Sequence, residues 1–215
     1  MQKQTQLVLS IFLLSIFSIN LSALNTYIIT GAPGTGKTSL IEALKAKGEQ
    51  TFPEIATMLI EKALERGEPN PATNDPYNFH RQIVQVHLEN IKKATKDLPS
   101  NGRMFLDRGL PDVGAYAKIY GLKAPEELKK AVKEHHYDAV FFLNFIVNED
   151  GGVVHRNTDV REENLPFALK IDELLKQEYK QLGYEVITVP SMSVEKRAKF
   201  VLETIKDITV KQSSN

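Results

Sequence analysis

Residues 25–44 read NTYIITGAPGTGKTSLIEAL, and they decide the fold. Asn25 to Thr30 is a short run of β-branched and aromatic residues, which predicts a buried strand. Lys37 to Lys47 has the apolar spacing of a helix, and Gly48 ends it. Between them, residues 31–38 match the pattern Gly-x-x-x-x-Gly-Lys-Thr in full. A strand that enters this pattern and a helix that leaves it predict a phosphate-binding P-loop.

The residue types in the loop suit the chemistry of phosphate binding. Three glycines let backbone N–H groups turn inward and form a nest for the β-phosphate, and the helix N-terminus adds partial positive charge there. Lys37 is expected to reach the β- and γ-phosphates, and the Thr38 hydroxyl to ligate Mg²⁺. We therefore expect a bound nucleoside triphosphate with Mg²⁺, held by Gly31, Ala32, Pro33, Gly34, Thr35, Gly36, Lys37, Thr38 and Ser39.

Beyond the loop, strand-like and helix-like segments keep alternating, which predicts a parallel sheet with helices on both faces. Further strands are expected at 50–53, 103–107, 138–145 and 185–189. Further helices are expected at 54–66, 77–96, 111–120, 125–135, 165–182 and 194–207. Residues 70–76 are expected to form a loop, and residues 148–164 a polar, mobile loop. The prediction is one domain at residues 25–210, followed by a disordered tail at 211–215.

Composition excludes several classes of function. The chain has 27 Lys plus Arg and 27 Asp plus Glu, so no overall field favours nucleic acid, and we expect no nucleic-acid partner. Cysteine is absent, which removes disulfides, thiol catalysis and zinc–thiolate sites. The five histidines show no metal-binding spacing.

Residues 1–24 form an apolar leader with three open interpretations. The run from Leu7 to Leu24 is marginal for a bilayer span, which needs about 20 residues. It also has the basic start and small residues, Ser22-Ala23, of a signal peptide. The third interpretation is a misread translation start, with the true start near Leu24. Because a triphosphate-binding loop needs cytosolic nucleotide, we expect a cytoplasmic protein. Membrane anchoring through residues 7–24 stays an alternative.

Carboxylates at strand ends are the candidate catalytic groups. Asp107 ends the apolar strand RMFLD, which would place it at the sheet edge beside the P-loop, where it could support Mg²⁺. The alternative is a cap for the next helix. Glu54 follows the second strand and could take a proton from an acceptor hydroxyl as general base. The alternative is a first-turn glutamate favoured by the helix dipole.

Two arginines in the polar loop at 148–164 are candidate lid groups. Arg156 and Arg161 could neutralise charge that develops on a transferred phosphoryl group, and Arg161 is preferred because it directly precedes the next helix. The alternative is a solvated loop whose arginines pair with neighbouring glutamates. Arg108 could pair with a carboxylate or reach a substrate.

Six segments of the chain occur in the order found in one protein family. They are YIITGAPGTGKTSLIEAL, FPEIATMLIE, FLDRGLPDVGAY, HYDAVFFL, VREE and GYEVITVP, and they span about residues 25–201. Together they resemble the AAA-type P-loop domain shared by the nicotinamide-riboside-kinase portion of NadR and the fly translocation-defect GTP-binding protein. The extra adenylyltransferase and regulatory domains of NadR have no counterpart in these segments, and the apolar leader is not part of the family pattern.

The resemblance implies a three-layer α/β P-loop NTPase fold. Its parallel five-stranded sheet would have the order 2-3-1-4-5, with helices on both faces and a lid loop after the fourth strand. The plan also resembles deoxynucleoside and shikimate-type kinases, in which a carboxylate after strand two meets the acceptor hydroxyl. Carried over by position, Lys37, Thr38 and Asp107 match well, Glu54 matches in place, and Arg161 matches the lid arginine loosely.

These features predict an Mg²⁺-dependent kinase that transfers the γ-phosphoryl group of ATP to a nucleoside-like or other hydroxyl acceptor. Its catalytic residues would be Lys37, Asp107, Glu54 and Arg161. ATP is favoured over GTP because the guanine-reading pattern Asn/Thr-Lys-x-Asp is absent, but the family includes a GTP binder, so GTP stays an alternative. The other hypotheses are an ATPase or GTPase switch that controls partner or membrane binding, and a non-catalytic nucleotide-binding module. The sequence names no protein partner.

Overall fold

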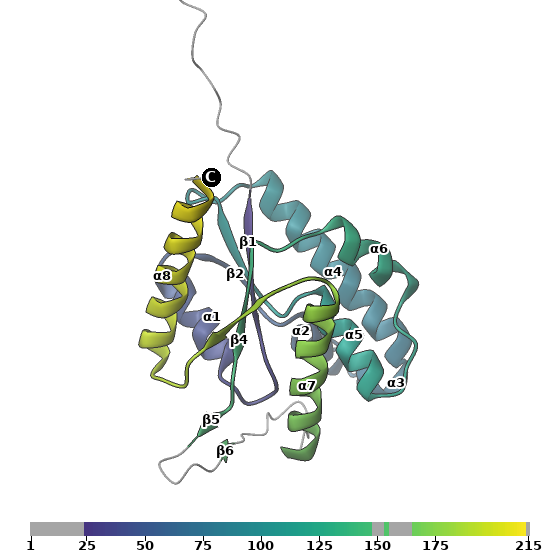
Figure 1. Cartoon of the computed structure of the whole chain (residues 1–215). Coiled ribbons are helices and arrows are strands. Elements are labelled where there is room, and N and C mark those ends of the chain that lie inside the picture. Colours follow the sequence, from purple (N-terminus) through teal and green to yellow (C-terminus); the bar gives the residue numbers. More distant parts are fainter. Residues whose placement is uncertain (1–23, 148–152, 155–164, 214–215) are drawn as a thin grey trace, which may run out of the picture.

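A computed structural model describes residues 24–147, 153–154 and 165–213 of the chain. Its centre is a parallel sheet of five strands in the order β2-β3-β1-β4-β7, which confirms the predicted order (Figure 1). The strands are β1 (Asn25–Thr30), β2 (Gln50–Phe52), β3 (Arg103–Asp107), β4 (Ala139–Leu143) and β7 (Val186–Val189). Two further short strands, β5 (Ile146–Val147) and β6 (Val153–Val154), pair with each other as an antiparallel ribbon.

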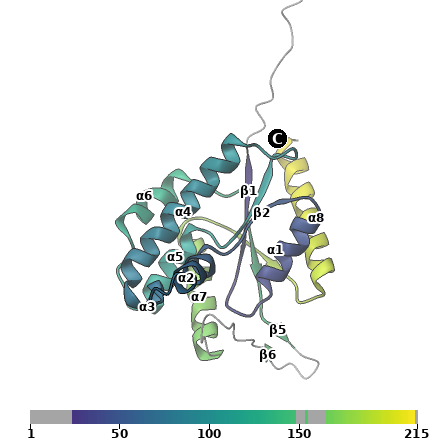
Figure 2. The same cartoon turned by 180° about the vertical axis from the view of Figure 1, so that it is seen from behind.

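Helices cover both faces of the sheet, as predicted. One face carries α1 (Lys37–Ala46) and α8 (Val194–Ser213), and the opposite face carries α4 (Pro76–Lys96), α5 (Leu110–Ile119) and α7 (Leu165–Gln181). The helix α6 (Glu126–Glu134) packs on α4 and α5. The helices α2 (Ile55–Glu65) and α3 (Pro71–Asn74) pack on α4 (Figure 2).

The central strands are apolar on both faces, as a parallel sheet between two helical layers requires. Tyr27 and Ile29 of β1 pack in the core under α1 and α8, whereas Ile28 between them packs in the core that includes Tyr179 of α7. In β4, Phe141 and Phe142 divide between the two layers in the same way. This alternation follows from the two-residue period of a strand, and it decides which helical layer each side chain faces.

The structure differs from the sequence prediction at three segments. Residues 153–154, expected within a mobile loop, form strand β6 and pair with β5. Residues 71–74 form the short helix α3 where a loop was expected, because the Asn70 side chain accepts a hydrogen bond from the N–H of Ala72 and Pro71 begins the helix. The last helix, α8, continues to Ser213 and so includes residues 211–213, which were assigned to a disordered tail.

Two predicted features lie outside the described residues. The leader at 1–23 is one, and the other is most of the 148–164 loop with Arg156 and Arg161. Among the described helices, none is both long and apolar enough to span a membrane.

A buried histidine joins α4 to the start of α5. His87 is 3% exposed, and its Nε2 lies 2.9 Å from the hydroxyl of Tyr137, which accepts a hydrogen bond from the N–H of Leu110. The hydroxyl of Tyr137 therefore contacts both the imidazole of α4 and the backbone at the start of α5. Burial, with a smaller effect from His135, lowers the pKa of His87 to about 3.

The neutral His87 makes folding sensitive to acid. Its pKa is lower in the folded chain than the unfolded value of about 6.5, so its contribution is fully present above pH 6.5 and is lost as the pH falls toward 3. We expect the free energy of unfolding to fall by about 1.4 kcal/mol per pH unit from this group alone. Urea unfolding between pH 4.5 and 6.5 measures the slope, which His87→Gln should reduce. The exposed His136→Gln should leave it unchanged, and equal slopes for the wild type and His87→Gln would contradict the assignment.

Candidate functional site

The parallel register brings the ends of three strands to one edge of the sheet. Ile29 of β1 is paired with Asp107 of β3, and Thr30 with Phe142 of β4. The P-loop leaves β1 at this edge and continues into α1. The loop and the residues after β3 are therefore neighbours, as expected for the binding edge of an α/β sheet.

The P-loop backbone has the shape that its glycines allow. Gly31, Gly34 and Gly36 have φ values of 140°, 78° and 86°, all in the region that favours glycine. A Cβ added at Gly31 would lie 2.5 Å from the carbonyl oxygen of Leu143 at the end of β4. A side chain at position 31 would therefore displace the loop from the sheet.

The lysine of the P-loop is buried and hydrogen-bonded to the backbone of the loop itself. Lys37 is 6% exposed, and its Nζ donates to the carbonyl oxygen of Ala32 at 2.8 Å. The hydroxyl of Thr35 donates to the same carbonyl at 2.9 Å. Burial, and next the charge of Arg108, lowers the pKa of Lys37. Thr38 and Ser39 stand exposed in the first turn of α1, open to solvent at the loop.

Asp107 is a buried carboxylate that fits a cation. It is 4% exposed, and within the described residues its Oδ1 has no hydrogen-bond partner. Burial, and next the charge of Glu54, raises its pKa. Thr38 and Asp107 are the residues that would hold Mg²⁺ here. No group of three or more acidic, histidine or cysteine side chains in the described part of the chain could hold a metal alone, so phosphate oxygens would have to complete the coordination.

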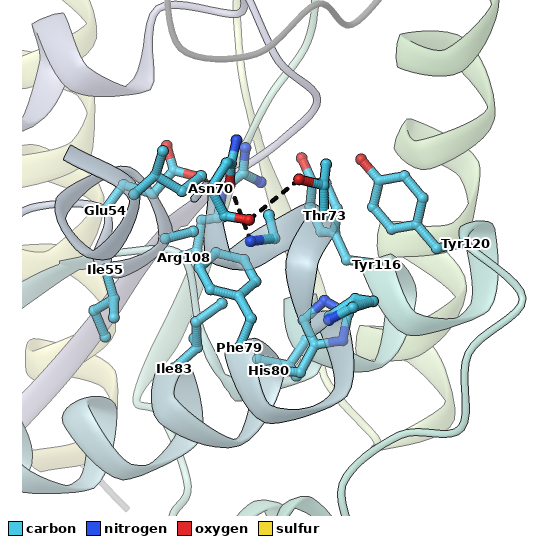
Figure 3. A pocket seen from close by; sticks show the side chains of 15 residues that line it. Glu54, Ile55, Asn70, Thr73, Phe79, His80, Ile83, Arg108, Tyr116 and Tyr120 are labelled. Atoms are coloured by element: carbon cyan, nitrogen blue, oxygen red, sulfur yellow. Dashed lines mark hydrogen bonds and ion pairs between the residues drawn. The ribbon is translucent and has the colours of Figure 1, made fainter. Parts of the chain in front are cut away.

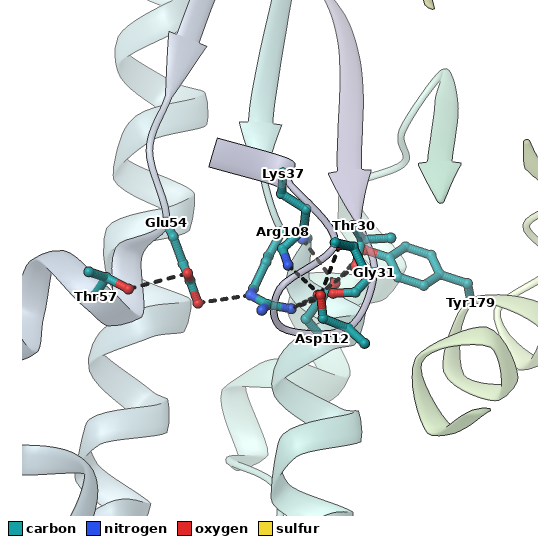
Figure 4. Close-up of polar contacts among 11 residues, drawn as sticks. Thr30, Gly31, Lys37, Glu54, Thr57, Arg108, Asp112 and Tyr179 are labelled. Atoms are coloured by element: carbon teal, nitrogen blue, oxygen red, sulfur yellow. Dashed lines mark hydrogen bonds and ion pairs between the residues drawn. The ribbon is translucent and has the colours of Figure 1, made fainter. Parts of the chain in front are cut away.

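Arg108 connects the P-loop to both neighbouring carboxylates (Figure 4). Its Nε donates to Oε1 of Glu54 at 2.8 Å, and its Nη1 lies 3.2 Å from both the carbonyl oxygen of Gly31 and Oδ1 of Asp112. Its guanidinium carbon lies 5.1 Å from the ring centre of Tyr116. The backbone of Arg108 has a φ of 74°, which a non-glycine residue adopts only at a cost.

Asp112 is the site residue that the sequence analysis missed. It is 2% exposed, and each of its oxygens accepts two hydrogen bonds. Oδ1 accepts from the Thr30 hydroxyl at 2.7 Å and from Arg108, and Oδ2 accepts from the Tyr179 hydroxyl at 2.6 Å and the Gly109 N–H at 3.1 Å. In the sequence, the signal for this role is the position of Asp112, two residues after the start of α5. An acidic side chain at that position accepts a hydrogen bond from the backbone N–H of the residue before the helix.

A cavity of about 430 Å³ opens beside this network (Figure 3). Glu54 stands at one side of it and Tyr120 at the other, and Arg108 and Tyr116 lie between them, in contact with each other. Its lining is largely apolar, from Ile55, Ala56, Ile60, Phe79, Ile83 and Val113, with polar groups from Asn70, Thr73 and His80. This size and lining are typical of a small-molecule site.

The predicted catalytic residues thus divide between two positions. Lys37 and Asp107 lie at the P-loop, and Glu54 faces the cavity, where it accepts from the Thr57 hydroxyl at 3.2 Å as well as from Arg108. Glu54 stands at the N-cap of α2 but its side chain does not cap that helix. The fourth residue, Arg161, lies outside the described residues. The roles assigned to all four stay predictions.

Known proteins share this architecture. A family model described as an AAA domain matches residues 26–197, and no curated protein matches the chain. A structure of NadR in complex with NR has a TM-score of 0.62 and 15% identity, covering 86% of this chain and 49% of that one. Thymidylate kinase from Candida albicans has a TM-score of 0.58 and 17% identity, covering 85% and 91%. Deoxyadenosine kinase from M. mycoides, with bound dATP, has a TM-score of 0.55 and 16% identity, covering 85% and 99%.

The comparisons establish a P-loop NTPase fold of the kinase-like type. At 15–17% identity, the likeness to these structures concerns the fold alone. The chain spans about half the length of the NadR protein that it matches.

Replacing Asp112 by Asn tests the network. The asparagine side chain has two orientations, and each places its NH₂ group against another donor. That donor is Arg108 in one orientation and the Gly109 N–H in the other. We expect the free energy of unfolding to fall by about 3 kcal/mol, because the buried Arg108 loses one of its two carboxylate partners and a buried donor is left without an acceptor. Urea unfolding at neutral pH measures the change. Asp207→Asn, an exposed substitution on α8, should stay within about 0.5 kcal/mol of the wild type. An equally small effect at Asp112 would refute the network.

Proposed function

The chain belongs to the AAA-domain family, and we propose that it is an Mg²⁺-dependent kinase that phosphorylates a small, uncharged, ring-bearing acceptor such as a nucleoside. One observation carries the proposal: the cavity and the P-loop share the wall formed by Glu54 and Arg108. An acceptor in the cavity would present its hydroxyl to Glu54, next to the loop that would hold the triphosphate. Proximity of this kind is the main requirement of phosphoryl transfer.

The charges around the loop support a metal-bound nucleotide. Two cations, Lys37 and Arg108, lie among three carboxylates, Glu54, Asp107 and Asp112. A triphosphate entering this group would lie close to carboxylates as well as to cations. Mg²⁺, held through Thr38 and Asp107, would add positive charge there and stabilise the charge of the phosphates. ATP is the proposed donor, and GTP stays an alternative.

Glu54 is placed to handle the acceptor hydroxyl. Arg108 and Thr57 fix its carboxylate at the cavity wall, so its geometry needs no rearrangement. In the proposed reaction the hydroxyl oxygen attacks the γ-phosphorus, its proton passes to Glu54, and the bond to the ADP oxygen breaks. Lys37 would stay on the phosphates throughout. Arg161 remains a proposed lid residue that would neutralise the charge developing on the transferred phosphoryl group.

The charge of the cavity supports an uncharged acceptor. Among its described lining residues, Arg108 is the only arginine or lysine, and its charge is already shared between Glu54 and Asp112. An acceptor that carried a phosphate would have to take Arg108 from those partners. The structural relatives include both a thymidylate kinase and a deoxyadenosine kinase, and this charge balance favours the second kind of acceptor. The aromatic side chains Phe79, Tyr116 and Tyr120 suit a flat ring.

An acceptor panel with Glu54→Gln tests the function. ADP release from ATP or GTP should rise on addition of a nucleoside, and nucleoside monophosphates should stimulate it less. Glu54→Gln should lower the stimulated kcat by about 10²- to 10⁴-fold, because the amide cannot take the proton, and should leave ATP affinity unchanged.

Glu61→Gln, exposed on the same helix, is the matched control and should behave as the wild type. Hydrolysis that no acceptor stimulates would instead support the nucleotide-switch hypothesis. Stimulation by monophosphates alone would overturn the proposed acceptor class.

Asp107→Asn tests the metal site. With Mg²⁺ present, ATP affinity should fall by about 10- to 100-fold; with EDTA it should be unchanged or higher, because a charge that repels phosphate is gone. Because the pKa of Asp107 is raised to about 7, protons compete with Mg²⁺ for its carboxylate, and Mg²⁺ affinity should increase as the pH rises through that value. Titration calorimetry measures the ATP affinity with Mg²⁺, the ATP affinity with EDTA, and the change of Mg²⁺ affinity with pH. The exposed Asp97→Asn should match the wild type. Equal losses with and without Mg²⁺ would argue against a metal role.

A further inference from the structure

A buried arginine reaches the P-loop from the last helix of the fold. Arg197 lies in the first turn of α8, where its N–H donates to the carbonyl oxygen of Ser193 at 2.9 Å. Its side chain is turned inward and is 3% exposed. Its Nη1 donates to the carbonyl oxygen of Thr35 at 2.8 Å. Thus α8, separated from the loop by most of the chain, contacts the backbone that is expected to cradle phosphate.

The contact with Thr35 determines where the next N–H group points. The carbonyl of Thr35 and the N–H of Gly36 belong to one planar trans peptide, so they point in opposite directions. Because Arg197 holds the carbonyl on the side of α8, the Gly36 N–H is directed to the other side, away from α8. Gly36 is also the N-cap of α1, with a φ of 86°. This peptide is one whose N–H the phosphate nest would use.

The charge of Arg197 is not balanced within the described residues. In that part of the chain it forms no ion pair, and its Nε has no hydrogen-bond partner. Burial lowers its pKa, although a guanidinium keeps its charge at any physiological pH. A buried cation without a partner is strongly unfavourable. The other buried guanidinium at the site, Arg108, differs because it has two carboxylates.

We propose that Arg197 is a positioning residue for the nucleotide: it orients the Thr35–Gly36 peptide, and its buried charge is compensated when polyphosphate occupies the loop. The protein without nucleotide then carries an electrostatic cost that binding removes. This inference rests on the nucleotide binding in the proposed function, but on neither the acceptor nor the transfer step.

Arg197→Met separates this role from a structural one. Methionine keeps the length and removes the charge and the donors. We expect Mg·ATP and Mg·ADP affinity, measured by calorimetry, to fall by roughly 10- to 100-fold. In urea without nucleotide, the variant should unfold at the same or a higher concentration than the wild type, because relief of the buried charge outweighs one lost hydrogen bond. Arg197→Lys keeps a charge and a donor and should recover most of the affinity.

Lys196→Met, an exposed change in the same turn of α8, should match the wild type in both measurements. An Arg197→Met protein that unfolds earlier without nucleotide, or does not fold, would overturn the proposal, because Arg197 would then be a structural residue. Unchanged Mg·ATP affinity would also overturn it. A wild-type chain that binds no Mg·ATP would remove the proposed function itself. Normal binding without kinase activity would remove only the transfer step and leave the role of Arg197 supported.

Discussion

The buried guanidinium of Arg108 is the group on which the arrangement of the site depends. It stands between Glu54, at the start of α2, and Asp112, in α5, and it also contacts the carbonyl of Gly31. A buried cation is stable only with such partners, so the three segments must meet in one geometry. Asp112 then extends the network to Thr30 and Tyr179, which ties β1 and α7 to the same point.

This network also divides the site into two chemical environments. On the P-loop side, Lys37 and Asp107 are both buried, and burial lowers the pKa of the amine and raises that of the carboxyl. On the cavity side, Glu54 is held by two donors beside an apolar space. The proposed kinase uses the first environment for a metal-bound polyphosphate and the second for an uncharged acceptor. Arg197 belongs to the first, since it supports the loop from behind.

Much of the fold could be predicted because its signals are local. Short apolar runs marked four of the five core strands, a weaker signal at 50–53 marked the other, and glycine and proline marked most helix ends. The sheet order came from the family resemblance, and the structure confirmed it. The helix at 71–74 was missed because its signal is one capping side chain and one proline in a segment rich in loop-forming residues. The burial of His87 was missed because a polar residue gives no sign of a partner that lies 50 residues away.

The sequence by itself determined the P-loop, since strand, glycine turn and helix are consecutive, and each residue there depends mainly on its neighbours. It also placed Asp107 and Glu54 at strand ends. Only the tertiary structure decided that Arg108 binds Glu54 and Asp112, and that Arg197 reaches Thr35 across 162 positions. Such contacts follow from how helices pack on the sheet, and a buried charge shows its partner only after the elements that carry both have come together.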